Sequence, residues 1–113
     1  MHELGITRSI VEIAERHARE QGAVRVISLT VQIGALSGVI AEAVEFAFEV
    51  CAQDSLLEGA RLIIDAVPGR GRCRACGAES AMDRFTYACP HCDALALDCI
   101  QGEELRILEL EVD

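Results

Sequence analysis

Aromatic side chains are scarce in this sequence. They account for 4% of the 113 residues, and tryptophan is absent, whereas hydrophobic residues make up 51%. We therefore expect a core that is packed mainly with aliphatic side chains. The length suits one domain, or one domain with a small appendage.

Basic residues are also few. Ten Lys and Arg residues stand against nineteen Asp and Glu residues, which gives a formal net charge of −9. A surface of that sign repels the phosphate backbone of nucleic acids. The composition therefore disfavours a nucleic-acid partner.

Long hydrophobic runs are missing as well. No stretch of about 18 apolar residues occurs, so no transmembrane helix and no membrane partner is expected. The start of the chain lacks the basic-then-apolar order of a signal peptide, because Glu3 comes first and further charges follow. The sequence predicts a cytoplasmic protein.

Signatures of catalysis are absent too. The sequence contains no Ser–His–Asp order, no Gly-rich phosphate loop and no suitable catalytic pair. We therefore expect a protein that is not an enzyme.

The periodicity of apolar residues predicts five elements. Residues 4–21 and about 38–52 repeat at helical spacing, while 24–33, about 60–67 and about 104–112 alternate as strands do. We expect Ser37 to cap the second helix. The strand at 60–67 is expected to pair antiparallel with the last strand.

The apolar faces of these elements give an expected core. The first helix is expected to bury Ile6, Ile10, Ile13, Ala14 and a partly buried His17. The first strand should present one face of Ile27, Leu29, Val31 and Ile33. The second helix should bury Ile40, Ala43, Val44, Ala47 and Cys51, widened by Phe46, Phe48 and Val50.

A segment rich in cysteine interrupts this pattern between the last two strands. Pro68 and Gly102 mark its two ends. The sequence therefore predicts an α+β fold in which two helices cover a three-stranded sheet and a four-cysteine, zinc-ribbon-like domain is inserted. Residues 1–68 with 103–113 would form the α/β domain, and 69–102 the inserted one.

The insert contains two Cys-x-x-Cys pairs, CRAC and CPHC, twelve residues apart. A gap of two residues lets both thiolates of one turn reach one ion, so Cys73, Cys76, Cys89 and Cys92 offer four soft ligands. A closed four-sulfur site suits structural zinc and leaves no open position for a catalytic water.

Other interpretations of these cysteines are weaker. Disulfides would suit an oxidising compartment, and a thioredoxin-like motif would account for one pair only. Rubredoxin-type iron uses the same geometry, so the spacing leaves iron open beside zinc. Cys51 and Cys99 lie outside the spacing and are expected to be packed residues, and His91 is expected to point outward.

The start of the chain, Met1–His2–Glu3, offers a different set of ligands. The amine, the His2 amide and the His2 imidazole can close a five-membered and then a six-membered ring around one ion, and Glu3 can add a fourth donor. Nickel(II) and copper(II) favour such nitrogen ligands over zinc. Without other support, a mobile end that happens to contain histidine is the simpler interpretation.

With both sets of ligands in place, the chain resembles the HypA/HybF family of hydrogenase nickel-incorporation proteins. The matching stretches are MHELGITRSIVEIAERHA, VQIGALSGV, FAFEV, the two cysteine pairs and QGEELRILELEVD. They occur in order along the whole chain, which makes the resemblance more specific than either motif.

The resemblance implies a nickel metallochaperone for the maturation of nickel–iron hydrogenase. His2 would be the principal nickel ligand, with the Met1 amine and Glu3 completing the site, and Cys73, Cys76, Cys89 and Cys92 would hold zinc. The implied partners are a HypB-type GTPase and the hydrogenase large subunit, and a homodimer is a further expectation.

One position departs from the family pattern. Many relatives carry an aspartate after the Ser-Gly turn, where this sequence has Ile40. An accessory carboxylate for nickel is therefore missing there. The alternative function is a zinc-ribbon module that binds proteins or nucleic acid, because Arg70, Arg72, Arg74 and Arg84 surround the cysteines and Phe85 and Tyr87 can stack on bases.

Overall fold

The computed structural model describes residues 2–113. The chain divides into two compact units. The first unit holds residues 2–32, Val39–Asp65 and Arg106–Asp113. The second unit holds Ile33–Gly38 and Ala66–Leu105, and it contains the cysteine pairs. The domain boundaries expected from the sequence stay a prediction, because compactness does not test independent folding.

The first unit has two helices. Helix α1 spans His2–Glu20 and helix α2 spans Ala41–Ala52, and the two pack against each other. The thiol of Cys51 lies 4.0 Å from the Leu4 carbonyl oxygen, at the start of α1. Both helices were expected within a few residues of these bounds.

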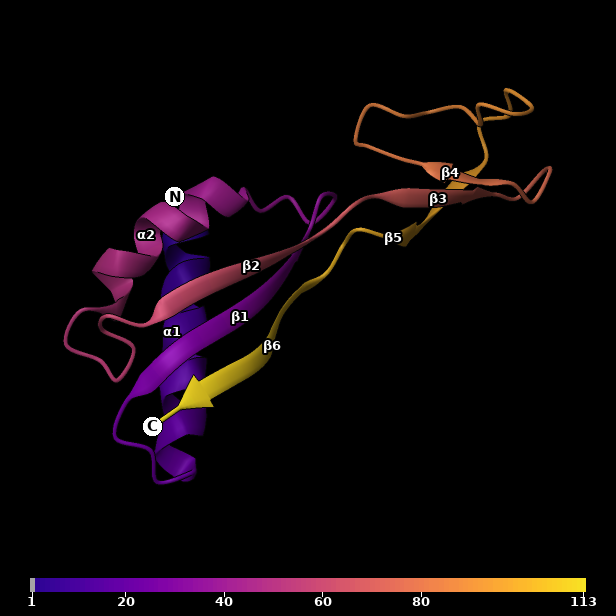
Figure 1. Cartoon of the computed structure of the whole chain (residues 1–113). Helices are drawn as coiled ribbons and strands as arrows, with labels where there is room; N and C mark the ends of the chain where they lie inside the picture. Colours follow the sequence, from indigo (N-terminus) through magenta and orange to yellow (C-terminus); the bar gives the residue numbers. More distant parts are fainter. Residues whose placement is uncertain (1) are drawn as a thin grey trace. The chain divides into compact units, whose positions relative to one another are not determined.

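Three strands form the sheet of the first unit. They are β1 (Val26–Gly34), β2 (Arg61–Val67) and β6 (Leu105–Val112), and their order is β2-β1-β6. Figure 1 shows β1 and β2 running in one direction and β6 in the opposite one. A parallel pair needs a crossover connection, and α2 supplies it between β1 and β2.

The strand order corrects one expectation. The strand at 60–67 does not pair with the last strand, because β1 lies between them. Side chains of β1 contact both neighbours: Gln32 donates from Nε2 to Asp65 of β2 at 3.1 Å, and its Oε1 accepts from Arg106 of β6 at 2.6 Å. A strand with four buried apolar residues is best placed at the centre, where two neighbours cover its edges.

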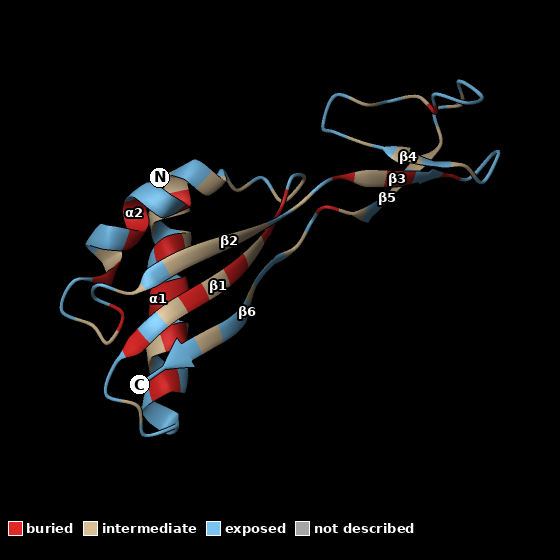
Figure 2. Ribbon diagram, viewed as in Figure 1, coloured by how far each residue is buried: buried red, intermediate tan, exposed pale blue. Residues whose placement is uncertain are grey.

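The core is mainly aliphatic, as the composition predicted. Figure 2 shows buried stretches on α1 and β1. The largest side chains with almost no exposed surface include Leu29, Leu57, Val26, Val31 and Val44. Phe48 is the single buried aromatic side chain in the described part of the chain. Burial of side chains of this size stabilises the fold by about 1.5–3 kcal/mol each.

Some details of the expected core were wrong. Ile13 and Ile27 are exposed, and α1 buries Thr7, Val11 and Ala18 instead. The imidazole of His17 is also exposed, at 63%. The buried stripe of α1 is rotated from the expected one because small residues allow close approach to the sheet and to α2.

The start of α2 also differs from the expectation. Its N-cap is Ile40, which has no side chain that can accept a hydrogen bond, and Ser37 does not cap the helix. Phe46 is 85% exposed, and Ile40 and Val50 are 58% exposed. The apolar residues of α2 therefore exceed what the core can cover.

The second unit has a smaller antiparallel sheet. Its strands are β3 (Arg70–Cys73), β4 (Glu79–Ala81) and β5 (Leu97–Gln101), in the order β4-β3-β5. Two helices, a three-stranded sheet and an inserted four-cysteine unit confirm the expected fold class. No helix among residues 2–113 is long and apolar enough to cross a membrane.

Candidate metal centre

Four cysteine sulfurs gather at one point of the second unit. The sulfurs of Cys73, Cys76, Cys89 and Cys92 all lie within 4.8 Å of one another. The Sγ atoms of Cys73 and Cys92 are 3.6 Å apart, as are those of Cys76 and Cys89. Because each of these close pairs joins the two turns, the cluster ties together segments that are far apart in the sequence.

The first cysteine turn begins where β3 ends. The Gly77 amide donates to the Cys73 carbonyl oxygen at 2.8 Å, and the Cys73 amide donates to Ala78 at 2.9 Å. The Ala75 amide donates to the Cys73 sulfur at 3.3 Å. The backbone of this turn thus holds the Cys73 sulfur in its direction.

The second turn repeats this pattern. The Asp93 amide donates to the Cys89 carbonyl oxygen at 2.8 Å, and the Cys89 amide donates to Ala94 at 2.9 Å. The His91 amide donates to the Cys89 sulfur at 3.4 Å. The two turns are therefore close structural copies, and each presents two sulfurs to the same point.

The dimensions of the cluster fit a tetrahedral ion. Metal–sulfur bonds of about 2.3 Å place neighbouring sulfurs about 3.8 Å apart in a tetrahedron. The two separations of 3.6 Å are close to this value. Cys73 and Cys89 are buried while Cys76 and Cys92 are exposed, so one side of the cluster faces solvent.

The thiols of the cluster differ in acidity. The backbone amide of Cys76 is the main cause that lowers the pKa of Cys73 to about 7, against burial, which raises it. The amide of Ala94 lowers the pKa of Cys92, but the neighbouring thiols and burial outweigh it and raise this pKa to about 12. A metal must therefore displace protons from part of the cluster when it binds.

The N-terminal residues form a separate group. Met1 lies outside the described residues, and His2 begins α1. The side chain of His2 is 63% exposed, and its Nε2 lies 3.0 Å from Oε2 of Glu3. That carboxylate oxygen is buried, and the His2 imidazole lies within ion-pair distance of it.

The first turn of α1 is fixed beneath this group. Thr7 is fully buried, and its hydroxyl donates to the Glu3 carbonyl oxygen at 2.6 Å. The position of Glu3 is therefore supported by the core.

The remaining candidates take no part in the cysteine cluster. Within residues 2–113, Cys73, Cys76, Cys89 and Cys92 make up the one group of three or more His, Cys, Asp or Glu side chains close enough to share an ion. Cys51 and Cys99 are half-buried and free, and His91 is exposed.

Two features of the second unit were missed from the sequence. Asp93 has a φ of 63°, which L residues seldom adopt. Its position in the sequence could have indicated this, because Asp93 directly follows the second cysteine pair just as Gly77 directly follows the first. The other feature is the close packing of Gly34, Gly69 and Gly102. No local motif marks these glycines, because they come together only in the fold.

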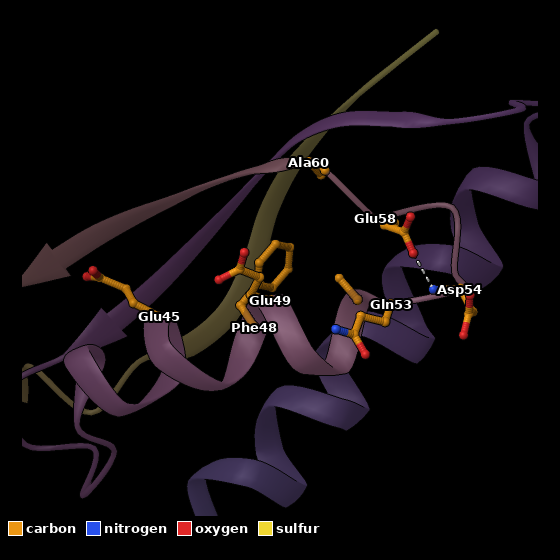
Figure 3. A pocket seen from close by; sticks show the side chains of 9 residues that line it. Glu45, Phe48, Glu49, Gln53, Asp54, Glu58 and Ala60 are labelled. Atoms are coloured by element: carbon orange, nitrogen blue, oxygen red, sulfur yellow. Dashed lines mark hydrogen bonds between the residues drawn. The ribbon is translucent and has the colours of Figure 1, made fainter.

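An acidic groove lies in the first unit beside α2 (Figure 3). It is lined by Glu45, Phe48, Glu49, Ala52, Gln53, Asp54, Glu58, Gly59 and Ala60. The Asp54 amide donates to Glu58 at 2.7 Å, so one of its four carboxylates is held by the loop itself. No other feature of the groove identifies a ligand, and we assign it no binding role.

Fold and site together define a small α+β metal-binding protein with a four-thiol cluster in an inserted unit. Residues 1–112 match the family described as "Hydrogenase/urease nickel incorporation, metallochaperone, hypA". The chain belongs to this HypA family.

Relatives of the same length support this assignment. The chain is 51% identical to the hydrogenase maturation factor HypA of Geobacter metallireducens and 48% identical to that of Geotalea uraniireducens, over the full length of both chains in each case.

Solved structures have the same fold. A solution structure of a HypA protein has a TM-score of 0.71 at 27% identity, and covers 99% of this chain and 96% of its own. The solution structure of the nickel metallochaperone HypA from Helicobacter pylori has a TM-score of 0.66 at 26% identity, with coverages of 97% and 96%.

Proposed function

We propose that this protein binds nickel(II) at its N-terminus and delivers it during the maturation of nickel–iron hydrogenase. The family match over residues 1–112 supports the role in nickel incorporation. The observation that supports the site is the short distance of 3.0 Å between the His2 imidazole and the buried Oε2 of Glu3. At this distance both side chains can bind one cation.

The proposed nickel site has ligands of intermediate softness. The Met1 amine, the His2 amide and imidazole, and Glu3 supply nitrogen and oxygen atoms, which suit nickel(II). The exposed position of His2 keeps the ion accessible to solvent and to a receiving protein. Such a site suits transfer rather than storage.

The proposed ion of the cysteine cluster is zinc, in a structural role. Four cysteine sulfurs within 4.8 Å of one another, with two pairs at 3.6 Å, favour a closed tetrahedral ion, and zinc supplies folding free energy without redox chemistry. Residues 69–102, as the expected inserted domain, would then depend on zinc for their order.

The proposed role needs partners and no catalysis. A HypB-type GTPase and the hydrogenase large subunit would be the proteins that exchange nickel with this chain, and the chain itself would act in the cytoplasm as a monomer or a homodimer. The chain would carry the ion and would not act as an enzyme.

Calorimetric titration with nickel tests the N-terminal site. We expect His2→Ala, and a variant with one extra residue before Met1, to bind nickel at least about tenfold more weakly than the native chain, because each removes part of the chelate. His17→Ala is the matched control, since His17 is an exposed histidine on the same helix. Equal nickel binding by all four proteins would overturn the proposal.

The second candidate function is a zinc-ribbon interaction module. It is favoured by the exposed rings of Phe85 and Tyr87 in the second unit and by the Arg84 guanidinium, 5.2 Å from the centre of the Phe85 ring. Binding of single-stranded oligonucleotides at physiological salt would support it. Nickel binding that depends on His2, without oligonucleotide binding, would exclude it.

A further inference from the structure

Three glycines of the second unit meet where separate segments of the chain converge. Gly34 ends β1, Gly69 precedes β3 and Gly102 follows β5, and all three are buried. A methyl group on Gly34 would overlap the Gly102 carbonyl oxygen, and one on Gly102 would lie 2.8 Å from the Gly69 Cα. The backbones of these segments are therefore in contact, and a larger residue at any of the three positions would separate them. We call Gly34, Leu36, Gly69 and Gly102 the clasp.

Backbone hydrogen bonds close the clasp around residues 34–36. The Gly34 amide donates to Glu104 at 2.7 Å, the Leu36 amide donates to Gly102 at 2.6 Å, and the Ala35 amide donates to Val67 at 2.9 Å. The half-buried Leu36 side chain would be 3.0 Å from a methyl group on Gly69 and 3.3 Å from one on Gly102. Two of the three acceptors, Gly102 and Glu104, lie in the short connection between β5 and β6.

The clasp is connected to the cysteine cluster through a very short sheet. Strand β3 begins at Arg70, next to Gly69, and ends at the metal ligand candidate Cys73. Arg70 is paired with both Ala81 of β4 and Gln101 of β5. The amide of Met82, after β4, donates to Gly69 at 3.0 Å, and the Gln101 side chain donates to Pro68 at 2.8 Å. All three strands therefore have one end at the clasp.

The sheet of β3, β4 and β5 is too small to be stable by itself. Its strands have four, three and five residues, and sheets of so few residues are not stable without other support. Of the large apolar side chains in the surrounding loops, Phe85, Tyr87 and Leu95 are exposed, and Met82 is half-buried beside Gly71, so the loops add little core. An ion on the four cysteines would therefore be the main source of order, because it would join both cysteine turns.

We propose that the clasp is a metal-dependent latch. With an ion on the four cysteines, β3 and β5 hold Gly69 and Gly102 in place, and residues 34–36 stay hydrogen-bonded. Without the ion, the short sheet loosens, the acceptors after β5 move away, and residues 34–36 are released. Because this segment leads from β1 towards α2, occupancy of the cluster controls the order of that connection. The inference rests on metal binding by the cysteines and not on nickel.

Amide hydrogen exchange of the full chain tests the latch. We compare the zinc-loaded protein with the same protein after chelation under reducing conditions. We expect the Gly34 and Leu36 amides to exchange at least about tenfold faster without zinc, while Val31, in the middle of β1, keeps its protection. Unchanged exchange at Gly34 and Leu36, or an equal loss of protection at Val31, would overturn the latch.

Two variants test the clasp without removing zinc. Leu36→Ala removes the packed side chain, and Gly102→Ala adds a methyl group where φ is 117°. Each should accelerate exchange at residues 34–36 while metal analysis still finds one zinc per chain. Gly5→Ala is the control, because a methyl group there meets nothing within 4 Å. If the native chain does not bind zinc, the proposed metal site is refuted. If the variants bind zinc and their amide exchange at residues 34–36 is unchanged, only the latch is refuted.

Discussion

Gly77 and Asp93 occupy equivalent positions in the two cysteine turns, with φ values of 79° and 63°. Each amide donates to the carbonyl oxygen of the first cysteine of its own turn, at the same distance of 2.8 Å. The chain therefore builds one turn twice, once with glycine and once with a residue for which this conformation is strained.

Asp93→Gly should stabilise the zinc-bound protein. The left-handed conformation costs a residue with a Cβ about 1 kcal/mol, which glycine avoids. Glycine also makes the unfolded chain more flexible, and this entropy offsets part of the gain. We expect a gain of roughly 0.5 kcal/mol in the free energy of unfolding, measured by denaturant titration with zinc bound. The reciprocal change, Gly77→Asp, should destabilise the protein, and a gain from it would contradict the account.

Cys76→Ser should abolish stoichiometric zinc binding, although Cys76 is exposed. Its sulfur lies 3.6 Å from that of Cys89, so its loss opens the tetrahedron. Cys51→Ser is the control, because Cys51 belongs to the first unit and is not one of the four clustered cysteines. Metal analysis of both purified variants decides the matter: one zinc per chain in Cys76→Ser would show that the cluster does not need all four sulfurs.

The number of protons released on zinc binding should rise as the pH falls through about 7. At pH 8 the raised pKa values of Cys76 and Cys92 keep at least these two thiols protonated before zinc binds, whereas Cys73, with a pKa of about 7, is mostly ionised already. At pH 6 Cys73 must also lose its proton, so zinc affinity falls more steeply there. Calorimetry in two buffers of different ionisation enthalpy counts the protons, and equal counts at both pH values would contradict this order of acidities.

Leu29→Ala should destabilise the first unit by about 2–5 kcal/mol, because it leaves a cavity in the central strand. Leu29 has no exposed surface. Ile27→Ala is the matched control on the same strand, since Ile27 is 39% exposed, and its effect should be much smaller. Denaturant titration measures the free energy of unfolding of both variants. Similar decreases in the two would show that Leu29 is not a core residue.

The sequence predicts much of this fold because its strongest patterns are local. The apolar repeats locate both helices and the three strands of the first sheet, and Cys-x-x-Cys spacing locates the metal cluster. The strands β3 and β4 have four and three residues, too few to show a period.

Strand order was harder to predict for a physical reason. The apolar residues in the sequences of β2 and β6 predict strands, but they do not identify which strand lies beside each, and neither strand has a fully buried residue. The central place of β1 depends on long-range pairing with both β2 and β6, to which the Gln32 side chain adds two hydrogen bonds. The clasp glycines were missed for the same reason, since Gly34 and Gly102 are far apart in sequence.

The central position of β1 has a consequence for protein engineering. The insert leaves the first sheet from β2 and returns into β6, and these strands form opposite edges of that sheet. Two strand spacings separate them, roughly 10 Å. A tight two-residue turn joins only adjacent antiparallel strands, so it cannot replace residues 69–102. A shortened chain would need a bridging loop that passes over the end of β1.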